Sequence, residues 1–166
     1  FLRIARLISE LPGPQQTDRI KNYLRRYLET EETAERQTVW FWMADLCHQD
    51  NDALGEIHSL AEVAMLSSAD LNTIASVANR LNNKLRDLKD RQIEEAWSSE
   101  VKELLDRVAD RLHSRMKDLD GTACSRLARL YLNIGNAEMA LKVAKHGLNI
   151  EPGNEHCVRL VERLGI

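Results

Sequence analysis

Glycine and proline are scarce in this sequence, which has seven Gly and three Pro among its 166 residues. Together they make up about 6% of the chain, roughly half of the 12% or so that is usual for these two residues. A small β-sandwich or barrel needs a turn residue about every ten positions, and this chain cannot supply them. The scarcity therefore argues against an all-β fold.

Aromatic residues and long apolar runs are also few. Aromatics account for 5% of the chain whereas charged residues account for 30%, a composition typical of stacked amphipathic helices. The longest wholly apolar runs are far below the roughly 20 residues that cross a bilayer, so we expect no membrane span. The length predicts one domain covering residues 1–166. Because the sequence begins with Phe1 rather than Met, we expect it to be a fragment of a longer protein.

No charge of one sign dominates the chain. The net charge is −3 and the isoelectric point is near 6.0, so there is no global positive field to hold a nucleic acid or an acidic membrane. One basic cluster is interleaved with Tyr23 and Tyr27 and could bind phosphates and stack bases. Its cations are Arg19, Lys21, Arg25 and Arg26. A cationic helix face is the commoner explanation, so nucleic acid is the least favoured partner.

Cysteine is rare as well, and the three in the chain are Cys47, Cys124 and Cys157. An odd number of cysteines scattered among helical patterns predicts reduced thiols, and therefore a cytoplasmic location. We expect these residues to act as small buried hydrophobic side chains.

Apolar residues recur at helical spacing along the chain and divide it into antiparallel hairpins. The predicted hairpins cover residues 1–30, 33–66 and 71–119, and the first one turns at residues 12–14. Charges of both signs are interleaved in 71–119, which predicts long helices with solvated outer faces. No Gly or Pro interrupts that segment, so the sequence leaves open whether it is one long helix or two, broken near residues 90–93.

Trp40, Phe41 and Trp42 are consecutive on one of the predicted helices. At helical spacing three such rings fan over about 200°, so this helix is expected to have neighbours on more than one side. These rings and Trp97 are predicted to lie in the core, with an aromatic ligand pocket as the alternative.

A 34-residue pattern occupies residues 121–154, which read GTACSRLARLYLNIGNAEMALKVAKHGLNIEPGN. Gly135 lies where two helices have to reverse, and glycine readily adopts the left-handed conformation that ends a helix. The stretch resembles a tetratricopeptide repeat (TPR), a helix-turn-helix unit of 34 residues. The positions that match the family signature are Leu127, Tyr131, Ala140 and Pro152.

The departures from the TPR signature shrink side chains. Cys124, Ala144 and Gly147 stand where the family has Trp, Phe and usually Ala. A single repeat cannot bury its own apolar face, so the rest of the chain must stack against it. The resemblance therefore implies an all-α fold in which antiparallel hairpins form a short TPR-like α-solenoid. In this arrangement residues 1–120 form irregular hairpins, and residues 155–166 form a closing helix.

Repeats of this family usually hold a peptide or another protein in a concave groove. The resemblance thus implies a protein-interaction module, a scaffold or adaptor whose partner is a peptide or a protein subunit. The groove positions that it implies for binding are Ser125, Arg129, Leu132, Asn133, Arg159 and Arg163, with Thr122 and His156 beside them. The arginines would pair with carboxylates of the partner. The alternative is an ordinary solvated arginine face.

A second hypothesis makes the chain a helical sensing or oligomerisation arm of a larger regulatory enzyme, such as an ATPase or a nuclease. The mixed-charge helices of 71–119 suit self-association. The sequence has no Gly-rich phosphate loop, HExxH or GxSxG motif. Asp110 and His113 are spaced like the Glu-x-x-His pairs of a di-iron bundle, but the acid is Asp rather than Glu. We therefore expect no enzymatic activity, no metal and no cofactor.

Overall fold

The computed structural model describes residues 1–11, 16–30 and 34–165. Within these ranges every regular element is helical, which confirms the all-α prediction, and none is both long and apolar enough to cross a membrane. The elements in chain order are α1 (Leu2–Ser9), α2 (Gln16–Thr30), α3 (Arg36–Gln49), α4 (Ala53–Met65), α5 (Leu71–Asp90), the 3₁₀ turn η1 (Glu94–Trp97), α6 (Ser99–His113), the 3₁₀ turn η2 (Met116–Asp118), α7 (Gly121–Ile134), α8 (Ala137–Ile150) and α9 (Glu155–Leu164). The turn expected at residues 12–14 lies outside the described residues.

Short polar side chains define where the helices from α4 onward begin. In each case a side-chain oxygen accepts a hydrogen bond from a backbone N–H of the first turn, a donor that the helix itself leaves unpaired. These caps are Asp52 (α4), Asp70 (α5), Ser98 (α6), Asp120 (α7), Asn136 (α8) and Asn154 (α9). At the other end of α7, Gly135 has a left-handed φ of 95°, as the sequence predicts for this reversal.

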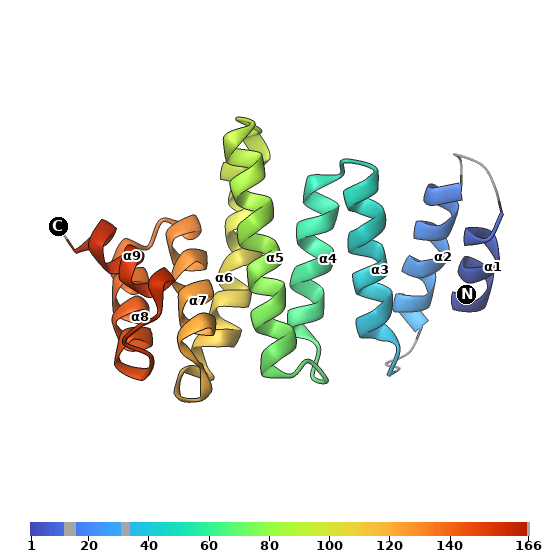
Figure 1. Ribbon diagram of the computed structural model, residues 1–166. Coiled ribbons are helices and arrows are strands. Elements are labelled where there is room, and N and C mark those ends of the chain that lie inside the picture. The colour runs from blue at the N-terminus through green and yellow to red at the C-terminus, as the bar shows by residue number, and fades with distance from the viewer. Residues whose placement is uncertain (12–15, 31–33, 166) are drawn as a thin grey trace.

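Residues 71–119 form two long helices rather than one. After α5 ends at Asp90, Gln92 adopts a left-handed φ of 56°, and η1 follows before Ser98 caps α6. Left-handed backbone is uncommon for residues other than Gly, Asn and Asp, so Gln92 gives no warning of the break. The connection between α5 and α6 projects beyond the ends of the other helices (Figure 1).

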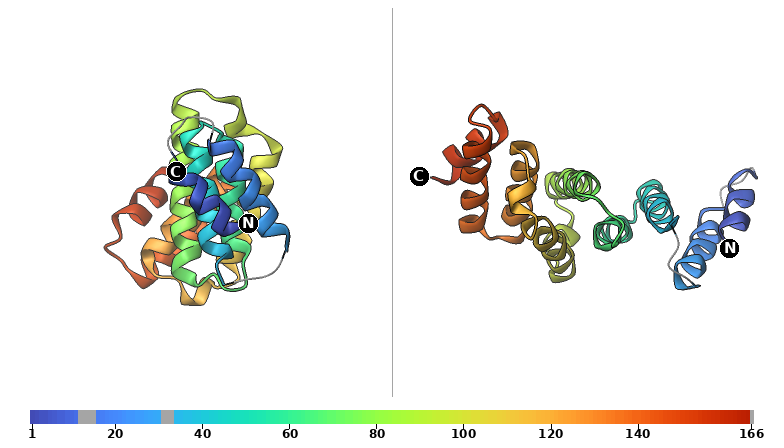
Figure 2. Two further views of the ribbon diagram at one scale, coloured as in Figure 1. Left: turned by 90° about the vertical axis from the view of Figure 1, so that its right-hand side faces the viewer. Right: turned by 90° about the horizontal axis from the view of Figure 1, so that it is seen from below.

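The antiparallel pairs follow one another in a single row, and the two chain termini lie at its opposite ends (Figure 1). In the right-hand view of Figure 2, α3, α5, α7 and α9 lie along one side of the row, and α4, α6 and α8 lie along the other. Consecutive pairs contact each other through α4 and α6 and through α5 and α7. The expected stack of hairpins is thus confirmed, and α9 closes its C-terminal end.

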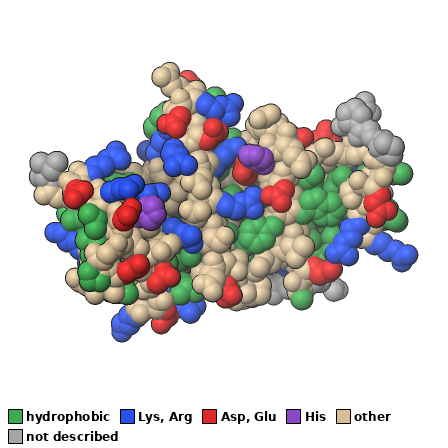
Figure 3. Space-filling view, viewed as in Figure 1, with side chains coloured by type: hydrophobic (Ala, Val, Ile, Leu, Met, Phe, Trp, Pro, Cys, Tyr) green, Lys and Arg blue, Asp and Glu red, His purple; other side chains and the backbone are tan. Residues whose placement is uncertain are grey.

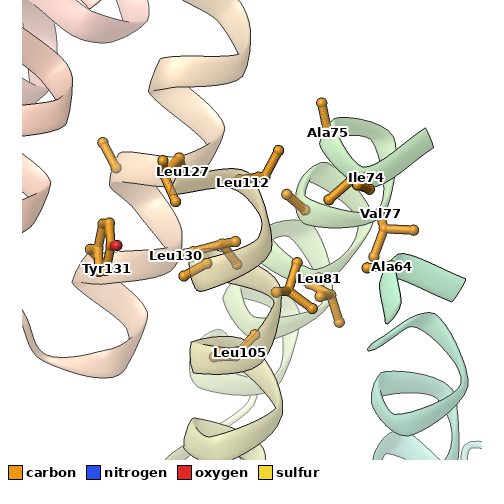
Figure 4. Close-up of a cluster of buried hydrophobic side chains, with 14 of the residues drawn as sticks. Ala64, Ile74, Ala75, Val77, Leu81, Leu105, Leu112, Leu127, Leu130 and Tyr131 are labelled. Atoms are coloured by element: carbon orange, nitrogen blue, oxygen red, sulfur yellow. The ribbon is translucent and has the colours of Figure 1, made fainter. Parts of the chain in front are cut away.

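Two clusters of buried apolar side chains hold the row together. The larger one runs from α3 to α9, and the smaller one joins α1, α2 and α3. In Figure 4, leucines of α5, α6 and α7 point into one shared space. They are Leu81, Leu105, Leu112, Leu127 and Leu130, and all are fully buried. Because the buried apolar side chains pack closely from one helix pair to the next, the pairs are held in a defined arrangement, and so are the surface side chains they carry.

The aromatic residues divide between core and surface. Trp40 packs against both apolar clusters, Phe41 against the larger and Trp42 against the smaller, so α3 has neighbours on more than one side, as expected. The prediction that Trp97 lies in the core is wrong, because this side chain is 50% exposed. The break after α5 places Trp97 in η1, out of register with the apolar stripe of α6, and Ala96 is buried there instead.

All three cysteines are free and buried, which confirms their prediction as small hydrophobic side chains. Cys124 of α7 and Cys157 of α9 both lie against Gly147 of α8. A Cβ at position 147 would be 2.9 Å from the Cβ of Cys124 and 2.7 Å from the Sγ of Cys157. Glycine at this position therefore gives α9 the room to pack closely on α7 and α8.

Candidate functional site

Side chains of α5, α7 and α9 surround a depression of about 570 Å³. It brings together five of the six residues that the sequence predicted for partner binding, and His156 beside them. These five are Arg129, Leu132, Asn133, Arg159 and Arg163. Lys and Arg side chains gather over the C-terminal end of the row of helices in Figure 3. We call this site the basic depression.

Helical spacing explains why these side chains converge. Arg129, Leu132 and Asn133 are three and four residues apart on α7, so they share one face of that helix. Arg159 and Arg163 are four residues apart on α9 in the same way. The buried face of α9, which includes Cys157, packs against α7 and α8, and the two arginines lie on the other face, where they line the depression.

Ser125, the sixth predicted residue, does not line the basic depression. Its side chain is buried, and its hydroxyl donates a hydrogen bond to the carbonyl of Thr122 over 2.8 Å. Thr122 lines a smaller hollow of about 200 Å³ between α5 and α7, together with Asp118 and Asp120.

The part of the site contributed by α5 was not predicted. Asn82, Arg86 and Lys89 line the basic depression from this helix, and they lie four and three residues apart along it. The TPR resemblance covers only residues 121–154, so it says nothing about how α5 faces α7. One signal was available, because Asn82 interrupts the apolar stripe of α5 with a buried amide.

A chain of hydrogen bonds ties α5 to α7 at the floor of the basic depression. The ammonium of Lys89 donates to Oδ1 of Asn133 over 2.6 Å, and Nδ2 of Asn133 donates to Oδ1 of Asn82 over 2.9 Å. Nδ2 of Asn82 in turn donates to the backbone carbonyl of Arg126 over 2.9 Å. These bonds hold the side chains of both helices in place before any ligand arrives.

Lys89 is a cation in a place that disfavours its charge. Burial lowers the pKa of Lys89 below its usual value of 10.5, and the positive charge of Lys102 shifts it in the same direction. Its polar partner is the neutral amide of Asn133, and no carboxylate among the described residues forms an ion pair with it. An anion placed in the depression would offset both the burial of the ammonium and the repulsion from Lys102.

Positive charge in the basic depression is largely unneutralised. Five cationic side chains and one carboxylate, that of Asp90, line it. Arg159 pairs with Glu155 over 3.1 Å, whereas Arg129 lies 3.4 Å from the Nδ1 atom of His156. The remaining cations are Arg86, Lys89 and Arg163. Within the described part of the chain, Arg159 is the one cation of the depression that has an ion pair.

An adjoining depression of about 560 Å³ shows the opposite arrangement. It lies between α3, α4 and α5 and shares Asn83 with the basic depression. Here each cation has a carboxylate: Arg80 pairs with Asp45 over 2.8 Å, and Lys84 pairs with Glu56 over 2.7 Å. We call this site the mixed-charge depression. Its charges are already satisfied within the protein.

One of the four cations in the basic cluster noted on α2 is withdrawn from the surface. Lys21 is buried, and its ammonium donates to the carboxylate of Asp50 over 2.6 Å. Among the described residues, no group of three or more His, Cys, Asp or Glu side chains is placed to hold a metal ion. The basic depression is therefore the candidate that combines shape with unpaired charge.

No protein-family model matches this sequence, and no curated protein matches it. The function of the basic depression therefore has to follow from its own residues.

Proposed function

We propose that this protein is a protein-interaction module, a TPR-like scaffold or adaptor that holds a peptide or a protein subunit in the basic depression. The observation that carries the proposal is the convergence of Arg129, Leu132, Asn133, Arg159 and Arg163 on one depression. The TPR resemblance implied these residues for partner binding, and they lie there beside polar and cationic groups of α5.

The composition of the basic depression suits binding rather than catalysis. Leu132 and Leu160 are the apolar residues of the lining, and the arginines and asparagine amides add hydrogen-bond donors and acceptors beside them. An apolar centre with a polar rim is the usual anatomy of a protein interface. The described residues that line the depression include no hydroxyl or thiol to serve as a nucleophile.

The test is a comparison of captured partners. Tagged wild-type protein and the Arg129→Glu/Arg163→Glu variant are used for affinity purification from the native host, followed by quantitative mass spectrometry. A matched control, Arg25→Glu/Arg26→Glu, makes the same charge change on exposed positions of α2. We expect at least one protein to be captured by the wild type and the control and lost from the depression variant. An identical set of captured proteins for all three would refute the proposal.

The alternative, a helical arm that self-associates through residues 71–119, is favoured by the exposure of Trp97 on the projecting α5–α6 connection. The apolar faces of α5 and α6, by contrast, are buried within the row. Light scattering after size-exclusion chromatography tests the alternative directly. A dimer that dissociates in Trp97→Lys but persists in Leu7→Lys, which changes a similarly exposed apolar residue of α1, would favour self-association through this segment.

A further inference from the structure

Building on the proposed function of the basic depression, we infer that its ligand is an acidic peptide segment, held by two or more Asp or Glu side chains within the segment rather than by a chain terminus. The inference names the chemical class of the partner. It rests on the number of unpaired cations, on their distribution over three helices, and on the residue types between them.

The first argument is the local charge balance. The chain as a whole carries a net charge of −3, yet five cations and one carboxylate, that of Asp90, line the depression, and four of these cations have no ion pair among the described residues. Elsewhere in the described chain, cations such as Arg80 and Lys84 are neutralised by carboxylates. Like charges held together in a concave site repel one another, and an anion bound there relieves that repulsion.

The second argument is the spread of the cations. Arg86 and Lys89 are three residues apart on α5, which corresponds to about 4.5 Å along the helix axis. Arg159 and Arg163 are four residues apart on α9, or about 6 Å along its axis, and Arg129 adds a charge from α7. A single terminal carboxylate would leave most of these charges without a partner. Several carboxylates along one peptide match them better.

The third argument separates a peptide from a nucleic acid. Single-stranded nucleic acids are held largely by Phe, Tyr and Trp side chains that stack on bases, and the described lining of the depression includes none of these three; its one ring is the imidazole of His156. Asn133 instead offers a partly exposed amide, and an amide matches the donors and acceptors of a peptide backbone.

The fourth argument is the state of Lys89. Its half-buried ammonium donates to a neutral amide and has no carboxylate partner among the described residues. A carboxylate of the ligand would supply the missing counter-charge, and hydrogen bonds between charged groups are stronger than those between neutral ones. The pre-formed bonds from Lys89 to Asn133 and from Asn133 to Asn82 lower the cost of ordering this part of the site.

The experiment uses four labelled probes and fluorescence anisotropy. The first is a short peptide with a C-terminal amide in which interior Glu residues alternate with Ser and Leu. The second replaces each Glu with Gln, and the third is this Gln peptide with a free C-terminal carboxylate. The fourth is a single-stranded oligoadenylate of similar length. Each is titrated with the protein in low salt and in about 0.2 M salt.

The acidic peptide is expected to bind, the Gln peptide to bind about tenfold more weakly or worse, and the affinity for the acidic peptide to fall as salt rises. Equal binding of the acidic and Gln peptides, or no binding of the acidic peptide, would overturn the inference. Tighter binding of the peptide with a free carboxylate would identify a chain terminus as the ligand instead. Tighter binding of oligoadenylate would identify a nucleic acid.

Variants locate the binding. Arg129→Glu/Arg163→Glu is expected to abolish binding of the acidic peptide, and the milder Arg129→Gln/Arg163→Gln to weaken it, with an unchanged circular dichroism spectrum in both. The matched control Arg25→Glu/Arg26→Glu on α2 is expected to bind as the wild type does. Binding that survives charge reversal in the depression would overturn the assignment to this site.

The two proposals fail in different ways. If no acidic peptide binds but capture of a host protein still depends on Arg129 and Arg163, the acidic ligand is refuted and the interaction module stands. If the captured proteins are also indifferent to both arginines, the proposed function falls as well.

Discussion

A buried ion pair between α4 and α5 offers the sharpest test of how the row is held together. The carboxylate of Glu56 lies 2.7 Å from the ammonium of Lys84, and the two side chains are only 7% and 10% exposed. His48 lies 3.1 Å from the same carboxylate, but its side chain is 66% exposed. We predict that Glu56→Gln destabilises the protein by about 3 kcal/mol, because it leaves the Lys84 ammonium buried without its counter-charge.

The magnitude follows from the burial of the pair. Removing one partner of a buried ion pair costs about 3–5 kcal/mol, since the remaining charge has given up its hydration and lost its partner. The low end applies here, because Lys84 retains some exposure and Gln keeps a carbonyl oxygen that can accept from it. For a chain of this size about 1 kcal/mol shifts the melting temperature by roughly 2–4 °C. A fall of about 6–12 °C is therefore expected.

The assay is urea unfolding followed by circular dichroism, with a double-mutant cycle. The variants are Glu56→Gln, Lys84→Met and the combination of the two. Because a buried ion pair roughly balances its own desolvation, the double variant is expected within about 1 kcal/mol of the wild type. This corresponds to a coupling energy of about 2 kcal/mol or more. The control His48→Gln removes an exposed contact to the same carboxylate and is expected to cost about 0.5 kcal/mol or less.

Two results would refute this reasoning. If Glu56→Gln costs less than about 1 kcal/mol, the charge of Lys84 is better hydrated in solution than its burial indicates. If the double variant loses as much as the two single variants together, the two charges are not coupled and the contact is incidental.

Three further predictions concern packing, thiol chemistry and pH. Gly147→Ala is expected to destabilise the protein by about 1–3 kcal/mol in urea unfolding, because the new Cβ would lie 2.7 Å from the Sγ of Cys157. In the control Gly153→Ala the new methyl group enters open space, so the free energy of unfolding should change little. Burial raises the pKa of all three cysteines, that of Cys124 to about 11. Ellman's reagent at pH 8 should therefore find no fast-reacting thiol in the native protein and three after unfolding, and a native thiol that reacts within seconds would contradict this. The backbone hydrogen bond from Thr73 lowers the pKa of Asp70 below its usual 3.8. The ionised carboxylate therefore stabilises the folded protein above about pH 4, and this stabilisation is lost as the pH falls through the lowered pKa. The stability difference between wild type and Asp70→Asn should therefore shrink from pH 6 to pH 2, and a constant difference would count against the charge.

The helices near the C-terminus could be predicted well from the sequence because their signals are local. Asp120 and Asn136 cap α7 and α8, and Gly135 takes the left-handed conformation between them. Each of these effects depends on atoms within one helical turn, so a short stretch of sequence contains all that is needed. The two helices consequently fall where the 34-residue pattern placed them.

The connection between α5 and α6 could not be predicted in the same way. Gln92 is left-handed without being Gly, and this reversal places Trp97 on the surface while Ala96 is buried. The choice depends on how α6 folds back along α4 and α5, which are distant in sequence. Periodicity alone put Trp97 in line with the apolar stripe of α6, and the tertiary packing overrode it.

The candidate site, too, could be predicted from the sequence only in part. Helical spacing places Arg129, Leu132 and Asn133 on one face of α7, and that much follows from sequence because it is geometry within one helix. Lys89 lines the depression and Ser125 is buried because of how α5 and α7 are rotated about their axes, which one helix alone does not determine.

By itself, the sequence determined that the chain is helical, where most of the helices from α4 onward begin, and which residues share a helix face, because all three depend on interactions within a turn or two. Only the tertiary structure decided which helix faces meet and which charges find partners. Arg80 reaches Asp45, a residue 35 positions away, while Arg163 meets no carboxylate in the described part of the chain. Such differences arise from the packing of distant apolar side chains, which sets how each helix is turned toward the next.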